Sequence, residues 1–205
     1  MNKSNVKCDF CNDKGYWEYN NQTLFCPLCN PEDAELQSLC KIPMIPWSRE
    51  YKKIYAKYYG PRFQVKPWLL VIHSGLYSKN IAEYFRNPTD GRSVSTHFAW
   101  SGEHDDFVQC VPFSNVAWHV GNSVFNGEKK LNFKSIGIEL PGPINHDRTE
   151  DEIEKTYKCI KNILYYSKSL KIAVKHSDID SNKKDPGDAF VWGKIKEMGL
   201  DIPFL

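Results

Sequence analysis

Short apolar segments rich in β-branched and aromatic residues alternate with segments of helical periodicity from residue 69 onward. The segment LLVIH at 69–73 is typical of a central strand covered on both faces. Thr149 opens a Thr-Glu-Asp-Glu capping box, and the apolar residues after it are spaced at four, three and four, which predicts a long helix to about Ser169. The other predicted strands span 94–100, 107–111, 135–140 and 172–176, and the other predicted helices span 81–85 and a segment ending near Gly199. Strands that alternate with helices predict an α/β sheet domain.

Residues 48–59 (SREYKKIYAKYY) repeat aromatic side chains at helical spacing, with Lys and Arg between them. Such a basic aromatic stripe could bind a glycan. We favour a helix that lies against the main domain, because a surface helix buries its apolar face against a neighbour.

The composition restricts the classes of function. A chain of 205 residues accommodates one domain of ordinary size and a small appendage, and its net charge of +2 lacks the basic footprint expected for a nucleic-acid partner. No apolar run approaches the roughly 18 residues that a membrane span needs. The first residues, MNKSNVKCDF, contain no hydrophobic segment of a signal peptide, so we expect a protein made and left in the cytoplasm unless another system exports it.

Two Cys-x2-Cys pairs, separated by fourteen residues, lie within the first thirty residues. They are Cys8 and Cys11, then Cys26 and Cys29. Four thiolates at this spacing can surround a structural Zn²⁺ tetrahedrally, and residues 16–19 and 23–25 between the pairs indicate a short hairpin. Two disulfides or a redox pair are the alternatives. The odd total of seven cysteines and a reducing compartment favour a four-cysteine zinc ribbon.

The segment KIPMIPW at 41–47 contains two prolines that forbid a continuous helix, so it predicts a linker. We therefore divide the chain into residues 1–45, the ribbon and linker, and residues 46–205, the main domain. Metal binding would supply much of the folding energy of so small a ribbon. Cys110 and Cys159 lie in apolar surroundings and are interpreted as buried small hydrophobic residues.

The stretch KHSDIDSNKKDPGDAF at 175–190 gathers metal-ligand types around a Pro-Gly turn. A catalytic zinc needs three protein ligands and a fourth position open to water. His176 and Asp185 supply two ligands, and the best third donor is His73, at the end of LLVIH. Each histidine alone would be read as structural, but their combination with this loop indicates a metal site.

Five motifs follow one another along the main domain: VIHSG at 71–75, VSTHFAW at 94–100, FVQCVPFSNVAWHVGNS at 107–123, FKSIGIELPG at 133–142 and HSDIDSNKKDPGDAF at 176–190. In this order they resemble the zinc-dependent N-acetylmuramoyl-L-alanine amidases, which include muropeptide amidases, amidase-type phage lysozymes and peptidoglycan recognition proteins. The resemblance covers residues 66–200 and not residues 1–45. It implies a mixed central β-sheet flanked by helices, here preceded by the four-cysteine ribbon.

The resemblance also implies roles for single residues. The catalytic Zn²⁺ would be held by His73, His176 and Asp185, with Glu139 as the catalytic acid/base and Lys183 as the oxyanion-stabilising residue. Lys184 is the alternative for that last role. Some phage members carry Cys at the third ligand position, whereas this chain has Asp, as the muropeptide amidases do.

Further residues are expected near the substrate. They are His119 beside the substrate groove, Trp118 as its wall, and Asn132 and Phe133 on the peptide-binding side. Gly137, two residues before Glu139 on one strand face, is expected to leave space for substrate or water. His97 is interpreted as a buried, hydrogen-bonded histidine near the site.

The implied reaction is hydrolysis of the amide between the lactyl group of N-acetylmuramic acid and L-alanine, with peptidoglycan or muropeptides as partners. We favour a phage endolysin, made in the host cytoplasm and released by a holin, because a recycling enzyme needs no ribbon for targeting. The alternatives are a cytoplasmic anhydro-muropeptide amidase of wall recycling and a non-catalytic peptidoglycan-binding protein. The last is disfavoured because all three ligands and Glu139 are present.

Overall fold

The computed structural model describes residues 16–19, 22–25, 50–62, 65–76, 80–187 and 192–203. The chain divides into two units, residues 1–44 and residues 45–205. In the first unit, β1 (Tyr16–Tyr19) pairs antiparallel with β2 (Gln22–Phe25), so the predicted hairpin is confirmed. Its four cysteines, Cys8, Cys11, Cys26 and Cys29, lie outside the described residues, and the ribbon zinc stays a prediction.

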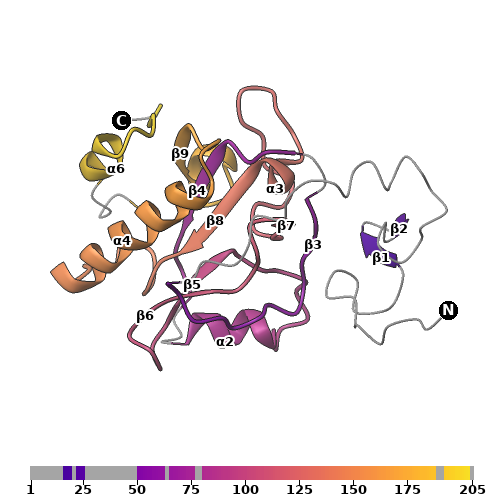
Figure 1. The fold of residues 1–205 in the computed structure, drawn as a ribbon, viewed down its shortest axis with the longest axis horizontal. Coiled ribbons are helices and arrows are strands. Elements are labelled where there is room, and N and C mark those ends of the chain that lie inside the picture. Colours follow the sequence, from indigo (N-terminus) through magenta and orange to yellow (C-terminus); the bar gives the residue numbers. More distant parts are fainter. Residues whose placement is uncertain are drawn as a thin grey trace, which may run out of the picture. The chain divides into compact units, whose positions relative to one another are not determined.

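The second unit is built on a five-stranded sheet in the order β6-β5-β8-β4-β9 (Figure 1). Its strands are β4 (Leu69–His73), β5 (Phe98–Ser101), β6 (Asp106–Gln109), β8 (Ser135–Glu139) and β9 (Ile172–Lys175). β4 runs parallel to β8 and β9, and β5 runs parallel to β8, whereas β6 is antiparallel to β5. The predicted mixed α/β fold is confirmed, with β4 and β8 buried along their whole length.

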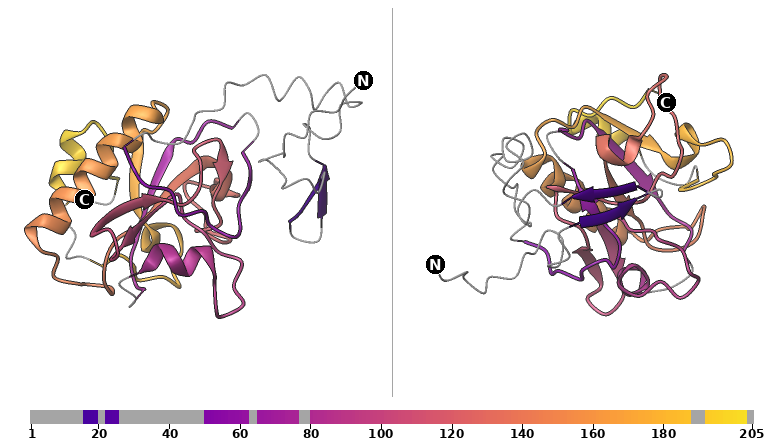
Figure 2. Two further views of the ribbon diagram at one scale, coloured as in Figure 1. Left: turned by 60° about the horizontal axis from the view of Figure 1, so that its bottom comes forward. Right: turned by 90° about the vertical axis from the view of Figure 1, so that its right-hand side faces the viewer.

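Helices flank this sheet. They are α2 (Ile81–Arg86), α3 (Leu131–Lys134), α4 (Glu150–Tyr166), α5 (His176–Ile179) and α6 (Gly193–Glu197). The predicted capping box starts α4: the Thr149 hydroxyl accepts from the Glu152 N–H, and the Glu152 carboxylate accepts from the Thr149 N–H. α4 and α6 lie side by side (Figure 2), with Lys194 Nζ 5.2 Å from the centre of the Tyr157 ring.

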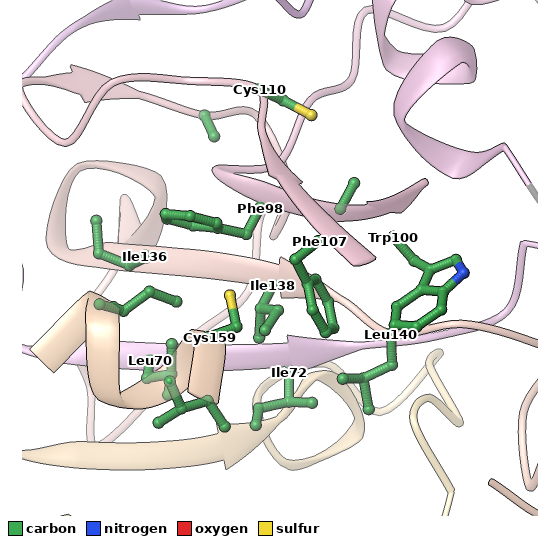
Figure 3. Packing of buried hydrophobic residues seen from close by; sticks show 14 of the residues in the cluster. Leu70, Ile72, Phe98, Trp100, Phe107, Cys110, Ile136, Ile138, Leu140 and Cys159 are labelled. Atoms are coloured by element: carbon green, nitrogen blue, oxygen red, sulfur yellow. The ribbon is translucent and has the colours of Figure 1, made fainter. Parts of the chain in front are cut away.

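Side chains of β4 alternate between two apolar clusters. Leu70 and Ile72 pack with Ile136 and Ile138 of β8 in the larger cluster, to which α2 and α4 also contribute (Figure 3). Leu69 and Val71 pack on the opposite face, in a cluster that includes residues 120, 125, 131, 174 and 179. Because alternate residues of a strand point to opposite faces, the last residues of β4 and β8 point to the side of this smaller cluster.

The larger cluster also contains the two cysteines of the main domain. Cys110 and Cys159 are free and fully buried, as predicted.

The prediction of a helix over residues 48–59 is wrong for the residues that the structure describes. Lys53 forms a parallel bridge with Gln109, and the N–H groups of Ile54 and Ala56 donate to the carbonyl oxygens of Gln109 and Cys110 at 3.1 and 3.0 Å. This segment therefore runs extended along β6 and covers an edge of the sheet. Pairing with a distant strand has overridden a spacing that suits a helix.

The opposite edge is covered as well. The N–H of Ala173 donates to the Asp201 oxygen, and the N–H of Asp201 donates to the Lys171 oxygen, both at 2.9 Å. Covered edges keep a sheet from pairing with other chains. A small second sheet pairs β3 (Gly60–Pro61) with β7 (Asn115–Val116). In the part of the chain that the structure describes, no helix has the length and apolar character needed to cross a membrane.

Candidate metal centre

The candidate site lies where three neighbouring parallel strands end. His73 is the last residue of β4, Glu139 is the last residue of β8, and the strand register places them directly opposite each other. His176 follows β9 at once, as the first residue of α5. Open α/β sheets bind ligands at this carboxyl edge of their strands.

Asp185 reaches the same place from the loop after α5. The N–H of Ser177 donates to the Asp185 carbonyl oxygen at 3.1 Å, and the Ser74 hydroxyl donates to the Pro186 oxygen at 3.3 Å. Gly187 has a φ of 81°, and a Cβ at this position would collide with Asn145. The turn therefore needs glycine both for its backbone conformation and for this close approach.

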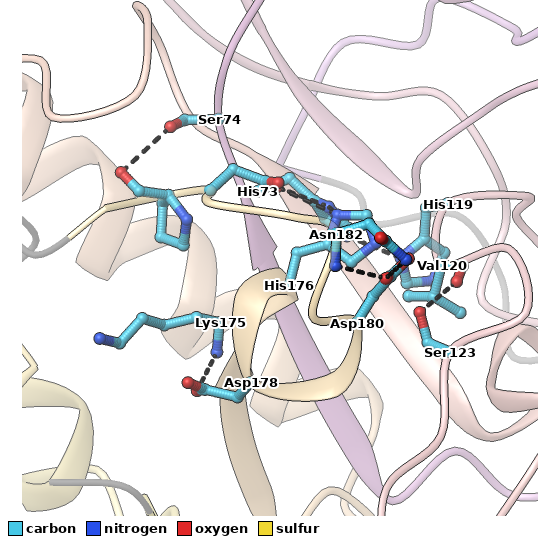
Figure 4. A network of polar contacts seen from close by, with 12 residues as sticks. His73, Ser74, His119, Val120, Ser123, Lys175, His176, Asp178, Asp180 and Asn182 are labelled. Carbon is cyan, nitrogen blue, oxygen red and sulfur yellow. Dashed lines mark hydrogen bonds and ion pairs between the residues drawn. The ribbon is translucent and has the colours of Figure 1, made fainter.

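Three potential ligand atoms face one another there, and Figure 4 shows the two histidines that supply two of them. His73 Nδ1 lies 3.1 Å from His176 Nδ1 and 3.3 Å from Asp185 Oδ2, and His176 Nδ1 lies 3.1 Å from the same carboxylate oxygen. Tetrahedral zinc, with bonds of about 2.0–2.1 Å, separates its ligand atoms by about 3.3 Å. All three residues are buried. Two imidazoles and one carboxylate at this spacing fit a divalent metal with one position left open.

Burial and hydrogen bonds together set the protonation of His73 and Asp185. Burial lowers the pKa of His73 to about 4, because a charged imidazole loses its hydration. Burial acts to raise the pKa of Asp185, but hydrogen bonds with His176 and His73 outweigh it and hold that pKa below its ordinary value. A neutral imidazole and an ionised carboxylate are the forms that bind a metal.

Glu139 is 8% exposed and shares this environment. Burial and the negative charge of Asp185 raise the pKa of Glu139 to about 8, while the charges of Arg148, Arg92 and Lys183 act in the opposite direction. A carboxyl group whose pKa lies near neutrality is suited to general acid–base chemistry.

Lys183 and Lys184 both expose their side chains on the loop between α5 and Asp185. The N–H of Lys183 donates to the Asp180 oxygen at 2.9 Å, which fixes the turn. The positive charge of Lys183 makes a small contribution that acts to lower the pKa of His73 and opposes the rise in the pKa of Glu139.

The four residues expected near a substrate lie close to one another. His119 Nδ1 lies 2.9 Å from His73 Nε2. Trp118 is half-buried, and its ring lies against Gly60 and meets the ring of Phe133 edge to face, with 6.0 Å between ring centres. Asn132 is buried, and its Oδ1 accepts from the N–H groups of residues 119 and 120, both at 3.0 Å. The structure gives Asn132 a role in holding this loop, and contact with a substrate stays a prediction for all four.

The expectation of open space at Gly137 is wrong. A Cβ at this position would lie 2.6 Å from His119 Nδ1 and 2.8 Å from Thr96 Oγ1. Gly137 therefore makes room for the imidazole ring of His119, not for substrate or water.

A buried layer behind His119 completes the site. His97 is fully buried, as expected, and its Nδ1 accepts from the Gly137 N–H at 3.1 Å. Arg62 lies 2.8 Å from His97 Nε2 and donates to the carbonyl oxygens of residues 113, 115, 133 and 135. Sequence reasoning missed Arg62, because a single arginine in GPRF belongs to no pattern.

The fold and this cluster define a class of protein: a mixed α/β domain with a buried His-His-Asp metal site at the carboxyl ends of its parallel strands. The chain belongs to the N-acetylmuramoyl-L-alanine amidase family, whose model matches residues 64–188, and it is accordingly a hydrolase of that family.

Similar proteins support this membership. The 1,6-anhydro-N-acetylmuramyl-L-alanine amidase AmpD of Enterobacter cloacae is 30% identical over 139 residues, which cover 64% of this chain and 71% of AmpD. The crystal structure of a selenomethionine AmpD derivative superposes with a TM-score of 0.65 at 26% identity, over 74% of this chain and 96% of that chain. The amidase AmiD from Escherichia coli, in complex with the substrate anhydro-N-acetylmuramic acid-L-Ala-D-γ-Glu-L-Lys, gives a TM-score of 0.52 at 25% identity, over 92% and 67% of the two chains.

Proposed function

We propose that the protein cleaves the amide between the lactyl group of N-acetylmuramic acid and L-alanine in soluble anhydro-muropeptides, as a step of cell-wall recycling. Two similarities support this substrate: AmpD is named for the anhydro-muramyl linkage, and AmiD was solved with an anhydro-muropeptide. The sequence alone favoured a phage endolysin because of the N-terminal ribbon. These relatives favour the recycling alternative instead.

The metal in this proposal is Zn²⁺, held by His73, His176 and Asp185. The observation that carries it is the spacing of 3.1–3.3 Å among the three buried ligand atoms. When bound, zinc polarises a carbonyl group and lowers the pKa of a water molecule from 15.7 to about 7. Two neutral imidazoles and one carboxylate leave the ion its net positive charge.

Glu139 moves the proton. Glu139 lies opposite His73 at the strand ends. Glu139 takes a proton from the attacking water as general base and returns it, as general acid, to the nitrogen of L-alanine when the amide breaks. In the metal-free protein, burial raises the pKa of Glu139 to about 8, within the range suited to general acid–base chemistry.

Lys183 stabilises the negative charge that develops on the carbonyl oxygen. A positioned cation near the reacting carbonyl is worth more in a water-poor site than in bulk water. The choice of Lys183 over the neighbouring Lys184 rests on the match of Lys183 to the lysine of the family motif.

Substrate contacts fall to the side of the site formed by Trp118 and Phe133. The two rings meet edge to face and offer an apolar wall. Asn132 supports this wall by fixing the backbone of residues 119 and 120.

A second, structural Zn²⁺ is proposed for Cys8, Cys11, Cys26 and Cys29. The β1–β2 hairpin lies between the two cysteine pairs in sequence and pairs Tyr16 with Phe25, which supports this proposal.

The substrate assignment is tested by incubating the purified protein with an anhydro-muropeptide and, separately, with intact peptidoglycan. Mass spectrometry then follows the release of free stem peptide. We expect release from the soluble substrate and far slower release from intact wall. Faster release from intact wall would support the endolysin alternative, and no release from either substrate would overturn the proposal.

A further inference from the structure

A chain of hydrogen bonds leads from the candidate metal site back to α3. His73 Nε2 lies 2.9 Å from His119 Nδ1, and His119 Nε2 lies 3.0 Å from Ser135 Oγ. Ser135 Oγ in turn lies 2.7 Å from the backbone oxygen of Leu131. Figure 4 shows His119 beside His73.

The last member determines the direction of every bond. A carbonyl oxygen only accepts, so the Ser135 hydroxyl donates to Leu131, and Ser135 Oγ then accepts from the Nε2–H of His119. A neutral His119 with its proton on Nε2 has a lone pair on Nδ1, which accepts from the Nε2–H of His73. His73 Nδ1 is left without a proton, and its lone pair faces the other two ligand atoms.

The ring of His119 has little freedom to leave this position. The backbone N–H of His119 donates to Asn132 Oδ1 at 3.0 Å. The ring lies over Gly137, where even a methyl group would collide with it. It also meets the ring of His73 edge to face, with 5.1 Å between ring centres.

We propose that His119 is a positioning residue that, with Ser135, holds His73 in the tautomer whose Nδ1 faces the metal. This inference rests on the proposed function only in taking Zn²⁺ as the ion that His73 binds. Ligand histidines generally donate their outer N–H to an acceptor, and loss of that acceptor weakens metal binding about 10–100-fold. Here the acceptor is a second histidine, and a serine one step further out sets the tautomer of that histidine.

The test is the zinc affinity of the full chain, measured by competition with a chromophoric chelator and therefore independent of catalysis. The four ribbon cysteines are the same in the parent and in every variant, so a difference in affinity reports on the site of His73, His176 and Asp185. His119→Asn and His119→Leu form a matched pair, because the two side chains are similar in size but only Asn offers an oxygen near the position of Nδ1. We expect His119→Leu to weaken zinc binding about 10–100-fold. His119→Asn should bind zinc close to the parent affinity.

A second pair removes one buried hydroxyl each. Ser135→Ala breaks the chain of hydrogen bonds, whereas Thr96→Val removes the hydroxyl of Thr96, which also lies at Gly137 but outside that chain. We expect weaker zinc binding in Ser135→Ala and the parent affinity in Thr96→Val. Equal affinities of His119→Leu and His119→Asn, or of Ser135→Ala and Thr96→Val, would overturn this inference alone. Failure of the parent protein to bind zinc would overturn the proposed function as well.

Discussion

His73 and Glu139 face each other across β4 and β8, each as the last residue of its strand. The register of two buried strands therefore fixes a proposed metal ligand and the proposed proton-transfer group side by side. Loops then add Asp185 and Lys183. Placing the two central groups on rigid strands holds their relative position more firmly than loops would.

The metal-free protein should lose stability as the pH rises above 6.5, because of Glu139. Burial raises the pKa of Glu139 from 4.5 to about 8. Between these two pH values the folded chain keeps a proton that the unfolded chain has released, so the free energy of unfolding falls as the pH rises. The contribution is of the order of a few kcal/mol, at about 1.4 kcal/mol per pKa unit. Below pH 6.5, His73 makes the free energy of unfolding rise with pH and so opposes the effect of Glu139, since burial lowers the pKa of His73 to about 4.

This dependence is measured by urea unfolding of the metal-free parent and of Glu139→Gln at several values from pH 6.5 to pH 8. Gln cannot titrate, so the variant should show a flatter profile. Identical profiles would mean that Glu139 does not carry the raised pKa.

Lys183→Ala should slow turnover and leave zinc binding unchanged. Loss of one oxyanion-stabilising group costs about 10²–10³-fold in kcat. Lys184→Ala is the matched control, since this neighbour is also exposed, and its turnover should stay near that of the parent. A large fall in kcat for Lys184→Ala alone would transfer the role to that residue.

The ribbon prediction concerns metal content. Elemental analysis of protein purified without added metal should give two zinc ions per chain, and one after deletion of residues 1–44. The shortened chain should still hydrolyse soluble muropeptides, because every residue assigned to chemistry lies in the second unit. A single zinc in the full chain that survives the deletion would refute the ribbon site.

The sheet and α4 were predictable because their signals are local. LLVIH is a buried strand by composition, and the Thr149 capping box marks the start of α4. α3 and α5 have four residues each, too few for a periodic pattern. Residues 50–59 were mistaken for a helix because their partner, the β6 edge, is distant in sequence.

The residues of the candidate site also divide into those with a local sequence signal and those without one. The sequence identified the three candidate ligands, His73, His176 and Asp185, because each is a metal-binding residue type near the end of a predicted segment. Ser135 and Arg62 have no such signal, because their importance depends on bonds to His119 and His97 that only the folded chain creates. The ring over Gly137 was missed for the same reason.

Metal binding and proton transfer should separate in two variants of the site. Asp185→Ala removes a ligand, so zinc content and activity should fall together. Glu139→Gln is nearly isosteric and leaves the three ligands in place, so zinc should stay bound while kcat on an anhydro-muropeptide falls about 10²–10⁴-fold. Zinc content and kcat measured on the same preparations are therefore the most direct test. Loss of activity with zinc retained in Glu139→Gln is the predicted result, and hydrolysis at the parent rate by that variant would contradict the account.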